Sequence, residues 1–381
     1  MAALIASSVV RTCLGDGGQT FAAMMRGESG VGPLRHGDPD RLNVRAGYHI
    51  GEKGHGRSFR ASEYLGQCVA EAARRAGLDT VRQRVVALVG TGLRELSAVE
   101  DRELTGASFP VERLHFGDVV RGALPGVGDV ITISNACSAG GHALALAQDL
   151  VESGDADAVV VGGTDTMTQS MLAMIGRAAA GPGHTGQIRP FDSARDGVLL
   201  GEGAAAAVLV PNSRPGAALG RVLATGLSCD AFHETAPDVD GICRSMLDAF
   251  NRSHRDPAAV DLVVAHGTGT ALNDPAESEA LRRVLIDAGG DPLVTAVKGA
   301  VGHTSGSASL ISLDVALRCL ATGVVPPVIG LREVLPEGHG LRFALGRHVP
   351  MRPTLVQIDA FGFGGVNAVS LIEPCGGSRT L

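Results

Sequence analysis

The chain has 381 residues, more than the roughly 250–300 at which a single hydrophobic core stops growing, so two domains or two related halves are expected. Apolar residues make up 45% and charged residues 19%, which excludes a disordered chain. The net charge of −7 and the absence of Trp disfavour a nucleic-acid binder, which needs a basic surface and stacking rings.

The seven cysteines are odd in number and widely spaced, and none forms a C-x-x-C pair. The pattern predicts neither a disulfide framework nor a zinc site, and we expect no bound metal. The first residues lack the positive segment of a signal peptide, and no apolar run approaches the ~18 residues of a membrane span. We therefore expect a cytoplasmic protein.

Short β-branched runs alternate with alanine-rich helical stretches along the chain, which favours buried strands in an α/β fold. In chain order we predict a strand over 1–11, a helix over 62–76, strands over 85–89 and 130–133, a helix over 139–153, a strand over 158–161, a helix over 245–251, a strand over 262–265, a helix over 276–288 and a strand over 355–359. Asn273-Asp274-Pro275 before the helix over 276–288 is typical of an N-cap with Pro at the first position.

The second half of the chain repeats the order of the first. The segments 85–92, 131–146 and 159–165 are echoed by 263–269, 294–313 and 358–367. Three matches in one order predict an internal duplication with a period of roughly 170 residues, too long for a solenoid array. We place the boundary in the linker-like stretch Pro211–Gly216, which gives one half over 1–212 and another over 213–381.

Cys137 is the candidate nucleophile. It follows a predicted strand, small residues surround it, and a helix begins after it. The positive end of a helix dipole favours a thiolate, so we expect this setting to activate the thiol. A lone cysteine is more often a small core residue, but a nucleophile needs the substrate access that stripped-down neighbours provide.

His266 and His303 each follow a strand of the second half in a glycine-rich setting. Either alone is more readily read as a structural histidine. Ligands collect beyond the carboxyl ends of parallel strands, so the two histidines and Cys137 are expected to converge there. The glycine-rich segment Phe361–Asn367 follows the last predicted strand, and its backbone N–H groups could supply an oxyanion donor.

Six motifs in this order resemble the β-ketoacyl synthases, the elongating condensing enzymes of type II fatty-acid and polyketide systems. They are Asn135–Gly140, Arg189–Gly197 with Gly201–Gly203, Asp230–Pro237, His266–Thr270 with Leu272–Pro275, Lys298–His303 and Phe361–Gly365. The resemblance runs from about residue 10 to the end. It implies the thiolase fold, in which two duplicated βαβαβαββ halves form a five-layer α-β-α-β-α sandwich.

The resemblance also implies roles for these residues. Cys137 would accept an acyl group from phosphopantetheine on an acyl carrier protein, and His266 and His303 would promote decarboxylation of the malonyl extender. Lys298 would hold His303 and the local charge in place.

Three further residues take roles from the same resemblance. Backbone N–H groups of Cys137 and Phe363 would form the oxyanion hole. Phe363 would also act as a gate beside the acyl pocket. Thr268 and Thr270 would contact the pantetheine arm. The resemblance implies substrates on carrier protein, no tightly bound cofactor, and a dimer, homomeric or with a related chain, in which 129–133 pairs across the interface.

Two departures from the family pattern concern the region after His303. Ser312 stands where the family usually has the Glu that supports Lys298, so a fall in the pKa of a buried Lys298 is expected from desolvation. Gly306–Ser309 reads Gly-Ser-Ala-Ser where Gly-Ala-Ala-Gly is usual. The stretch 94–128 is also shorter than in fatty-acid enzymes and barely matches them. Together these departures favour a specialised natural-product enzyme.

Two other functions remain open from the sequence. An acyl-Cys137 enzyme with another acceptor would make an ester, an amide or an unusual carbon–carbon bond. A chain-length-factor-like partner would be non-catalytic, and the intact Cys137, His266 and His303 argue against it.

Overall fold

The computed structural model describes residues 3–51, 58–178, 186–213 and 218–375. The first half contains the following elements: β1 (Ala3–Thr12), β2 (Gly15–Asp16), α1 (Gly17–Met25), β3 (Gly32–Pro33), α2 (Pro39–Leu42), β4 (Ala46–Gly47), α3 (Arg60–Ala76), β5 (Val85–Gly90), α4 (Leu96–Thr105), η1 (Val111–Leu114), α5 (Gly117–Ala123), β6 (Val130–Ile133), η2 (Ala136–Ser138), α6 (Ala139–Ser153), β7 (Ala158–Asp165), α7 (Gln169–Ala178) and β8 (Gly203–Pro211).

The second half follows the same plan. Its elements are β9 (Gly220–Cys229), α8 (Val239–Ser253), η3 (Pro257–Ala259), β10 (Leu262–Ala265), α9 (Asn273–Leu281), the π-helical turn η4 (Arg282–Ile286), β11 (Leu293–Ala296), α10 (Lys298–Val301), η5 (Ser305–Ser307), α11 (Ala308–Thr322), β12 (Val324–Val325), η6 (Pro336–Gly338), β13 (Arg342–Phe343), β14 (Val349–Pro350), β15 (Val356–Gly362) and β16 (Val366–Glu373).

The sheet order reveals the duplication directly. One half runs β1-β8-β7-β5-β6 and the other runs β9-β16-β15-β10-β11, with β13 beyond β11. In both halves the first two pairings are antiparallel and the last two are parallel. Ala3–Ile5 of β1 pairs with Gly220–Val222 of β9 and joins the halves. The three predicted repeats fall on β5 and β10, on β6–α6 and β11–α11, and on β7 and β15, so they are confirmed.

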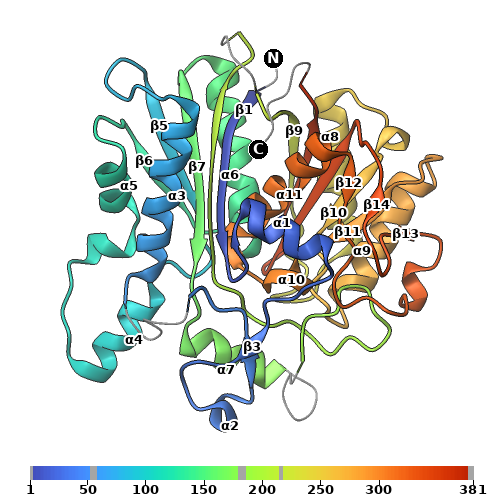
Figure 1. Ribbon diagram of the computed structural model, residues 1–381, viewed down its shortest axis with the longest axis horizontal. Coiled ribbons are helices and arrows are strands. Elements are labelled where there is room, and N and C mark those ends of the chain that lie inside the picture. Colours follow the sequence, from blue (N-terminus) through green and yellow to red (C-terminus); the bar gives the residue numbers. More distant parts are fainter. Residues whose placement is uncertain (1–2, 52–57, 179–185, 214–217, 376–381) are drawn as a thin grey trace.

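The helices form layers, with α6 and α11 in the middle of the molecule (Figure 1). Helices α6 and α11 pack on each other and on strands of both halves, whereas α3 covers the first half and α8 the second. Nearly every residue of α11 from Ala308 to Leu320 is buried, as expected for a central helix covered on all sides, whereas α3 buries one face only. The result is the α-β-α-β-α order of the thiolase fold.

Some predicted boundaries differ from the structure. The helix expected over 276–288 begins at Asn273 as α9, and η4 replaces its last part. The expected N-cap is wrong: Leu272 occupies the cap, and the Oγ1 of Thr270 accepts the Asn273 N–H at 3.1 Å instead. Helix α8 is longer than predicted because Asp238 caps it and accepts the Gly241 N–H. Within the described ranges, no helix combines the length and apolarity that crossing a bilayer requires.

Candidate active site

Cys137 lies in η2, the short turn between the edge strand β6 and the central helix α6. The preceding residue, Ala136, adopts a left-handed backbone with φ of 47°. Ser305 takes the same conformation (φ 50°) at the start of η5, the corresponding turn of the second half. Left-handed conformations are costly for residues other than glycine and persist where surrounding structure imposes them, often at functional sites. The elbow predicted around Cys137 is therefore a sharp, strained turn.

Cys137 is a half-buried residue, and electrostatic effects of opposite sign act on its thiol. Burial raises its pKa to about 11, while the charge of Lys298 and the backbone N–H groups of Phe363 and Cys137 lower it. The favourable effect expected from the helix start does not prevail in the resting site, because desolvation outweighs the contributions that lower the pKa. The two N–H groups that reach the sulfur come from η2 and from the β15–β16 hairpin.

His266 follows β10 and is buried. Its backbone N–H donates to Glu277 Oε1 at 2.7 Å. Its Nδ1 accepts the Phe361 N–H at 3.4 Å and lies 3.2 Å from Lys298 Nζ. Because donors surround Nδ1, the ring proton of a neutral His266 lies on Nε2.

His303 lies beyond α10, with its ring centroid 5.6 Å from that of His266 and the ring planes at 87°. Its backbone bonds to both sides of Leu200: the N–H donates to the Leu199 carbonyl and the carbonyl accepts from Gly201 N–H, each at 2.9 Å. Its Nδ1 accepts the Ser305 N–H at 3.3 Å, so its proton also lies on Nε2.

Both imidazoles are neutral in the resting site. Burial, followed by the charge of Lys298, lowers the pKa of His303 well below its ordinary value. Burial, Lys298 and then His303 do the same for the pKa of His266. A pair of neutral rings with Nε2–H groups can donate two hydrogen bonds to a developing negative charge.

Lys298 begins α10, and the structure attaches it to a different histidine from the one expected. Its Nζ donates to the His266 carbonyl and lies near His266 Nδ1, whereas the resemblance linked it to His303. Both residues follow neighbouring parallel strands, β10 and β11, and their carboxyl ends meet at one sheet edge.

Lys298 has acidic neighbours even though Ser312 replaces the glutamate that usually supports it. Burial lowers its pKa to about 8, and the carboxyl groups of Glu277, Asp274 and Asp359 act in the opposite direction. The fall expected from desolvation is confirmed in direction. These acids come from α9 and β15, which are distant in sequence from Ser312, the position where the family usually has a glutamate.

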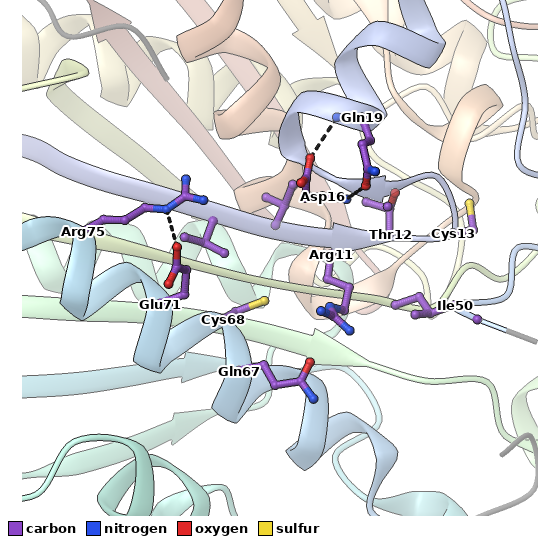
Figure 2. Close-up of a pocket in the computed structure, with 14 residues that line it drawn as sticks. Arg11, Thr12, Cys13, Asp16, Gln19, Ile50, Gln67, Cys68, Glu71 and Arg75 are labelled. Carbon is purple, nitrogen blue, oxygen red and sulfur yellow. Dashed lines mark hydrogen bonds and ion pairs between the residues drawn. The ribbon is translucent and has the colours of Figure 1, made fainter. Parts of the chain in front are cut away.

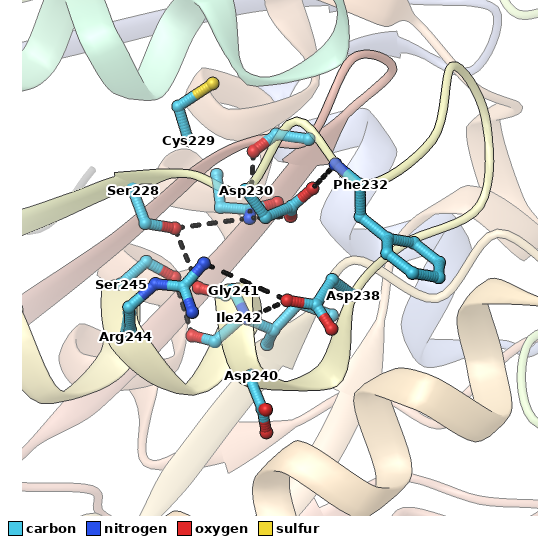
Figure 3. A network of polar contacts seen from close by, with 12 residues as sticks. Ser228, Cys229, Asp230, Phe232, Asp238, Asp240, Gly241, Ile242, Arg244 and Ser245 are labelled. Carbon is cyan, nitrogen blue, oxygen red and sulfur yellow. Dashed lines mark hydrogen bonds and ion pairs between the residues drawn. The ribbon is translucent and has the colours of Figure 1, made fainter.

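Phe363 stands in the three-residue loop between β15 and β16, and its side chain is 41% exposed. A polar network fixes this loop: Asp230 donates its N–H to the Gly365 carbonyl at 3.0 Å, and Asn367 Nδ2 donates to Asp230 Oδ2 at 3.1 Å (Figure 3). Gly365 has φ of 76°, and a Cβ there would lie 2.0 Å from Asp230 Oδ1. Only glycine fits, so the network holds the Phe363 N–H at the thiol.

Thr268 and Thr270 form a hydroxyl pair on the turn after His266, with 2.8 Å between their Oγ1 atoms. The buried carboxylate of Asp274 orders this turn by accepting the N–H groups of Thr268, Gly269 and Phe191. Thr268 is buried and Thr270 half-buried, so Thr270 lies nearer the surface.

Sequence reasoning missed three buried carboxyl groups around the site, those of Asp165, Glu277 and Asp359. Asp165 ends β7 and accepts hydrogen bonds from Thr91 Oγ1 and the N–H groups of Gly92 and Gly306, among others. Asp165 ends β7, whereas Glu277 lies in α9 and Asp359 lies in the middle of β15, so the strand-end signal that pointed to Cys137 could have found only Asp165.

A separate hollow of about 450 Å³ lies between β1, α1 and α3, lined by Arg11, Cys13, Cys68, Glu71 and Arg75 among others (Figure 2). None of its lining residues belongs to the site around Cys137.

A strained cysteine turn, two neutral histidines and converging N–H donors on a duplicated α/β fold define an acyl-transfer enzyme of the thiolase type. Comparison with family models identifies the β-ketoacyl synthase N-terminal domain over residues 48–214 and the C-terminal domain over residues 219–332. The chain belongs to the β-ketoacyl synthase family and is an acyltransferase.

Relatives and solved structures agree with this assignment. The chain is 28% identical to 3-oxoacyl-[acyl-carrier-protein] synthase 2 of Coxiella burnetii, with 93% of each chain covered. It is 31% identical to nodulation protein E of Rhizobium sp., with 78% of each covered. A solved structure described as the ishigamide ketosynthase/chain length factor has a TM-score of 0.86 and 27% identity, covering 98% of this chain and 99% of that one.

Proposed function

We propose that the protein is a β-ketoacyl-[acyl-carrier-protein] synthase that transfers an acyl group to Cys137 and then performs a decarboxylative Claisen condensation with malonyl-carrier protein. The observation that carries this proposal is that the half-buried Cys137 and two neutral histidines all interact with Lys298, while each histidine has its Nδ1 occupied by a backbone donor. That arrangement leaves two Nε2–H groups free to stabilise an oxyanion.

In the acyl-transfer step, Cys137 Sγ attacks the carbonyl carbon of the incoming thioester. The pantetheine thiol leaves and takes the proton that the cysteine loses. The N–H groups of Cys137 and Phe363 point at the sulfur, so they are placed to receive the oxygen of the tetrahedral intermediate. The positive charge of Lys298 favours the transient thiolate.

In the condensation step, His266 and His303 donate their Nε2–H groups to the thioester oxygen of the malonyl group. Loss of carbon dioxide then leaves an enolate whose charge the two donors stabilise. The enolate carbon attacks the acyl-cysteine and releases the thiolate. Neutral rings can fill this role, because each keeps its proton on Nε2 as a donor, and burial keeps the rings neutral.

The pantetheine arm is assigned to Thr268 and Thr270, whose paired hydroxyls lie on the turn after His266. The two ketosynthase halves are assigned to residues 1–212, which carry Cys137, and 213–381, which carry the histidines, Lys298 and the glycine-rich loop. Part of the proposed boundary, residues 214–217, lies outside the described residues. We assign no tightly bound cofactor; the substrates arrive on phosphopantetheine.

The partners are an acyl carrier protein and a second ketosynthase-like chain, identical or related. The solved ishigamide complex pairs a ketosynthase with a chain length factor, which supports such pairing and a specialised polyketide pathway. Strand β6 ends the sheet order and exposes Ile131, so an unpaired edge is available for a partner strand. All seven cysteines are free thiols, which suits the reducing cytoplasm.

The test is carbon dioxide release from malonyl-carrier protein by the acyl-loaded protein, alone and with candidate partner chains. The proposal expects release coupled to a β-ketoacyl product. Acyl loading with an ester or amide product and no carbon dioxide would identify the alternative acyltransferase. No loading at all, with or without a partner, would identify a non-catalytic chain.

A further inference from the structure

Asp359 is a buried carboxyl group whose two oxygens are unequally satisfied. It lies in β15, with 2% of its surface exposed. Oδ1 accepts a hydrogen bond from Gln357 Nε2 at 2.8 Å. Within the part of the chain that the structure describes, no protein donor reaches its buried Oδ2. A buried oxygen without a donor is strongly destabilising if it carries charge.

The group that does face Asp359 is another carboxyl, that of Glu277 on α9. Burial and then the charge of Glu277 raise the pKa of Asp359 well above its ordinary value, and a side-chain contact between the two carboxyl groups adds to this rise. Glu277 is fully buried and already engaged: Oε1 accepts the His266 N–H, and Oε2 accepts the Gly267 N–H at 2.8 Å and Asn273 Nδ2 at 3.1 Å. Two oxygens cannot share a hydrogen bond unless one of them carries a proton.

The charges around this pair also favour one retained proton. The charged groups that act on this pair are Asp274 from α9 and the ammonium of Lys298 at the start of α10, and Lys298 itself also interacts with Cys137 of η2. With all three carboxyl groups ionised, one ammonium would face three negative charges away from water. Like charges that close cannot all ionise in a dry site.

The position of the Glu277 carboxylate matters for the geometry of the site. It holds the backbone of both His266 and Gly267, so its position sets where the His266 ring stands. We propose that Asp359 is a positioning residue, held as a protonated carboxylic acid that donates its Oδ2 hydrogen to Glu277 and so fixes the carboxylate beneath His266. This goes beyond the roles assigned to the cysteine, histidines and lysine. Only its activity test rests on the proposed function.

Infrared spectroscopy of the full-length protein tests the proton directly. The C=O stretch of a carboxylic acid is absent from a carboxylate and shifts on exchange into D2O. Asp359→Asn should remove one such band at neutral pH. The matched control Asp314→Asn should leave the band, because Asp314 is equally buried but paired with Arg318 at 2.7 Å. Identical carboxylic-acid bands in the wild type and Asp359→Asn would overturn the proposal.

Gln357→Leu identifies the direction of the proton. If the proton faces Glu277, removing the amide at position 357 should keep the acid band of Asp359 and shift it to higher wavenumber, because the carbonyl oxygen Oδ1 loses its donor. If the band disappears in Gln357→Leu, the protonated state depends on Gln357 and the proposal is overturned.

The activity test uses the conservative variant. Asn at position 359 still offers an N–H to Glu277 but cannot ionise, whereas Leu offers no donor. Asp359→Asn should therefore retain at least several-fold more malonyl decarboxylation than Asp359→Leu, and its rate should persist to higher pH than that of the wild type. Equal rates and equal alkaline limits in the three proteins would contradict the positioning role, while the infrared result stands regardless of the reaction catalysed.

Discussion

The loop that carries Phe363 offers a sharp test, because two adjacent glycines differ in one respect. Gly364 and Gly365 both have positive φ, 82° and 76°, so an alanine at either costs about 1–2 kcal/mol of stability from backbone conformation. A Cβ at 364 would meet nothing within 4 Å, whereas one at 365 would lie 2.0 Å from Asp230 Oδ1 and 2.8 Å from the Ala231 nitrogen. Only Gly365→Ala must displace the loop.

The expected magnitude follows from what the loop carries. Moving it withdraws the Phe363 N–H from Cys137, and loss of one oxyanion donor slows acyl transfer by about 10²–10³-fold. Gly364→Ala should lose the same backbone contribution of about 1–2 kcal/mol to stability, but its acyl loading should stay within about tenfold of the wild-type rate. Loading is measured by mass spectrometry after mixing with acyl-carrier thioester. Equal loading rates in the two variants would refute the role of this loop.

Three further predictions concern charge and burial. Lys298→Met should slow malonyl decarboxylation more than acyl loading, because Lys298 bonds to His266 directly and acts on the thiol only through its charge; equal losses in the two half-reactions would contradict this. The pKa of Lys298 is about 8 in the fold against an ordinary 10.5, so the unfolded chain binds more protons between these values. The free energy of unfolding of the wild type, measured with urea, should therefore increase with pH between these values more than that of Lys298→Met. Parallel plots of unfolding free energy against pH for the two proteins would contradict this. Arg60→Met should destabilise the fold by about 3–5 kcal/mol, since it leaves Glu202 buried without its partner at 2.7 Å; a loss below about 1 kcal/mol would show that the pair contributes little.

The fold was largely predictable because its signals are local. Buried parallel strands appear as β-branched runs, and β6, β10 and α6 begin and end where the sequence predicted. The duplication was visible because each repeat keeps its strand and the turn that follows. Helix starts were less predictable: α9 begins with a cap supplied by Thr270, which no local cap motif indicates.

The site was predictable in its reactive groups but not in its electrostatics. Strand-end positions pointed to Cys137, His266 and His303, because parallel strands bring their carboxyl ends together. The attachment of Lys298 to His266 depends on the pairing of β10 with β11, and its acidic neighbours come from α9 and β15. The raised pKa of Cys137 depends on burial, which spacing along the chain does not reveal.

The central claim is that Cys137 carries the acyl group delivered by a carrier protein. Incubation with acyl-carrier thioester, followed by intact-mass measurement and peptide mapping, tests it most directly. We predict one acyl adduct per chain on the Cys137 peptide, and none in Cys137→Ala with its fold intact. An adduct on another residue, or an undiminished adduct in Cys137→Ala, would contradict the claim.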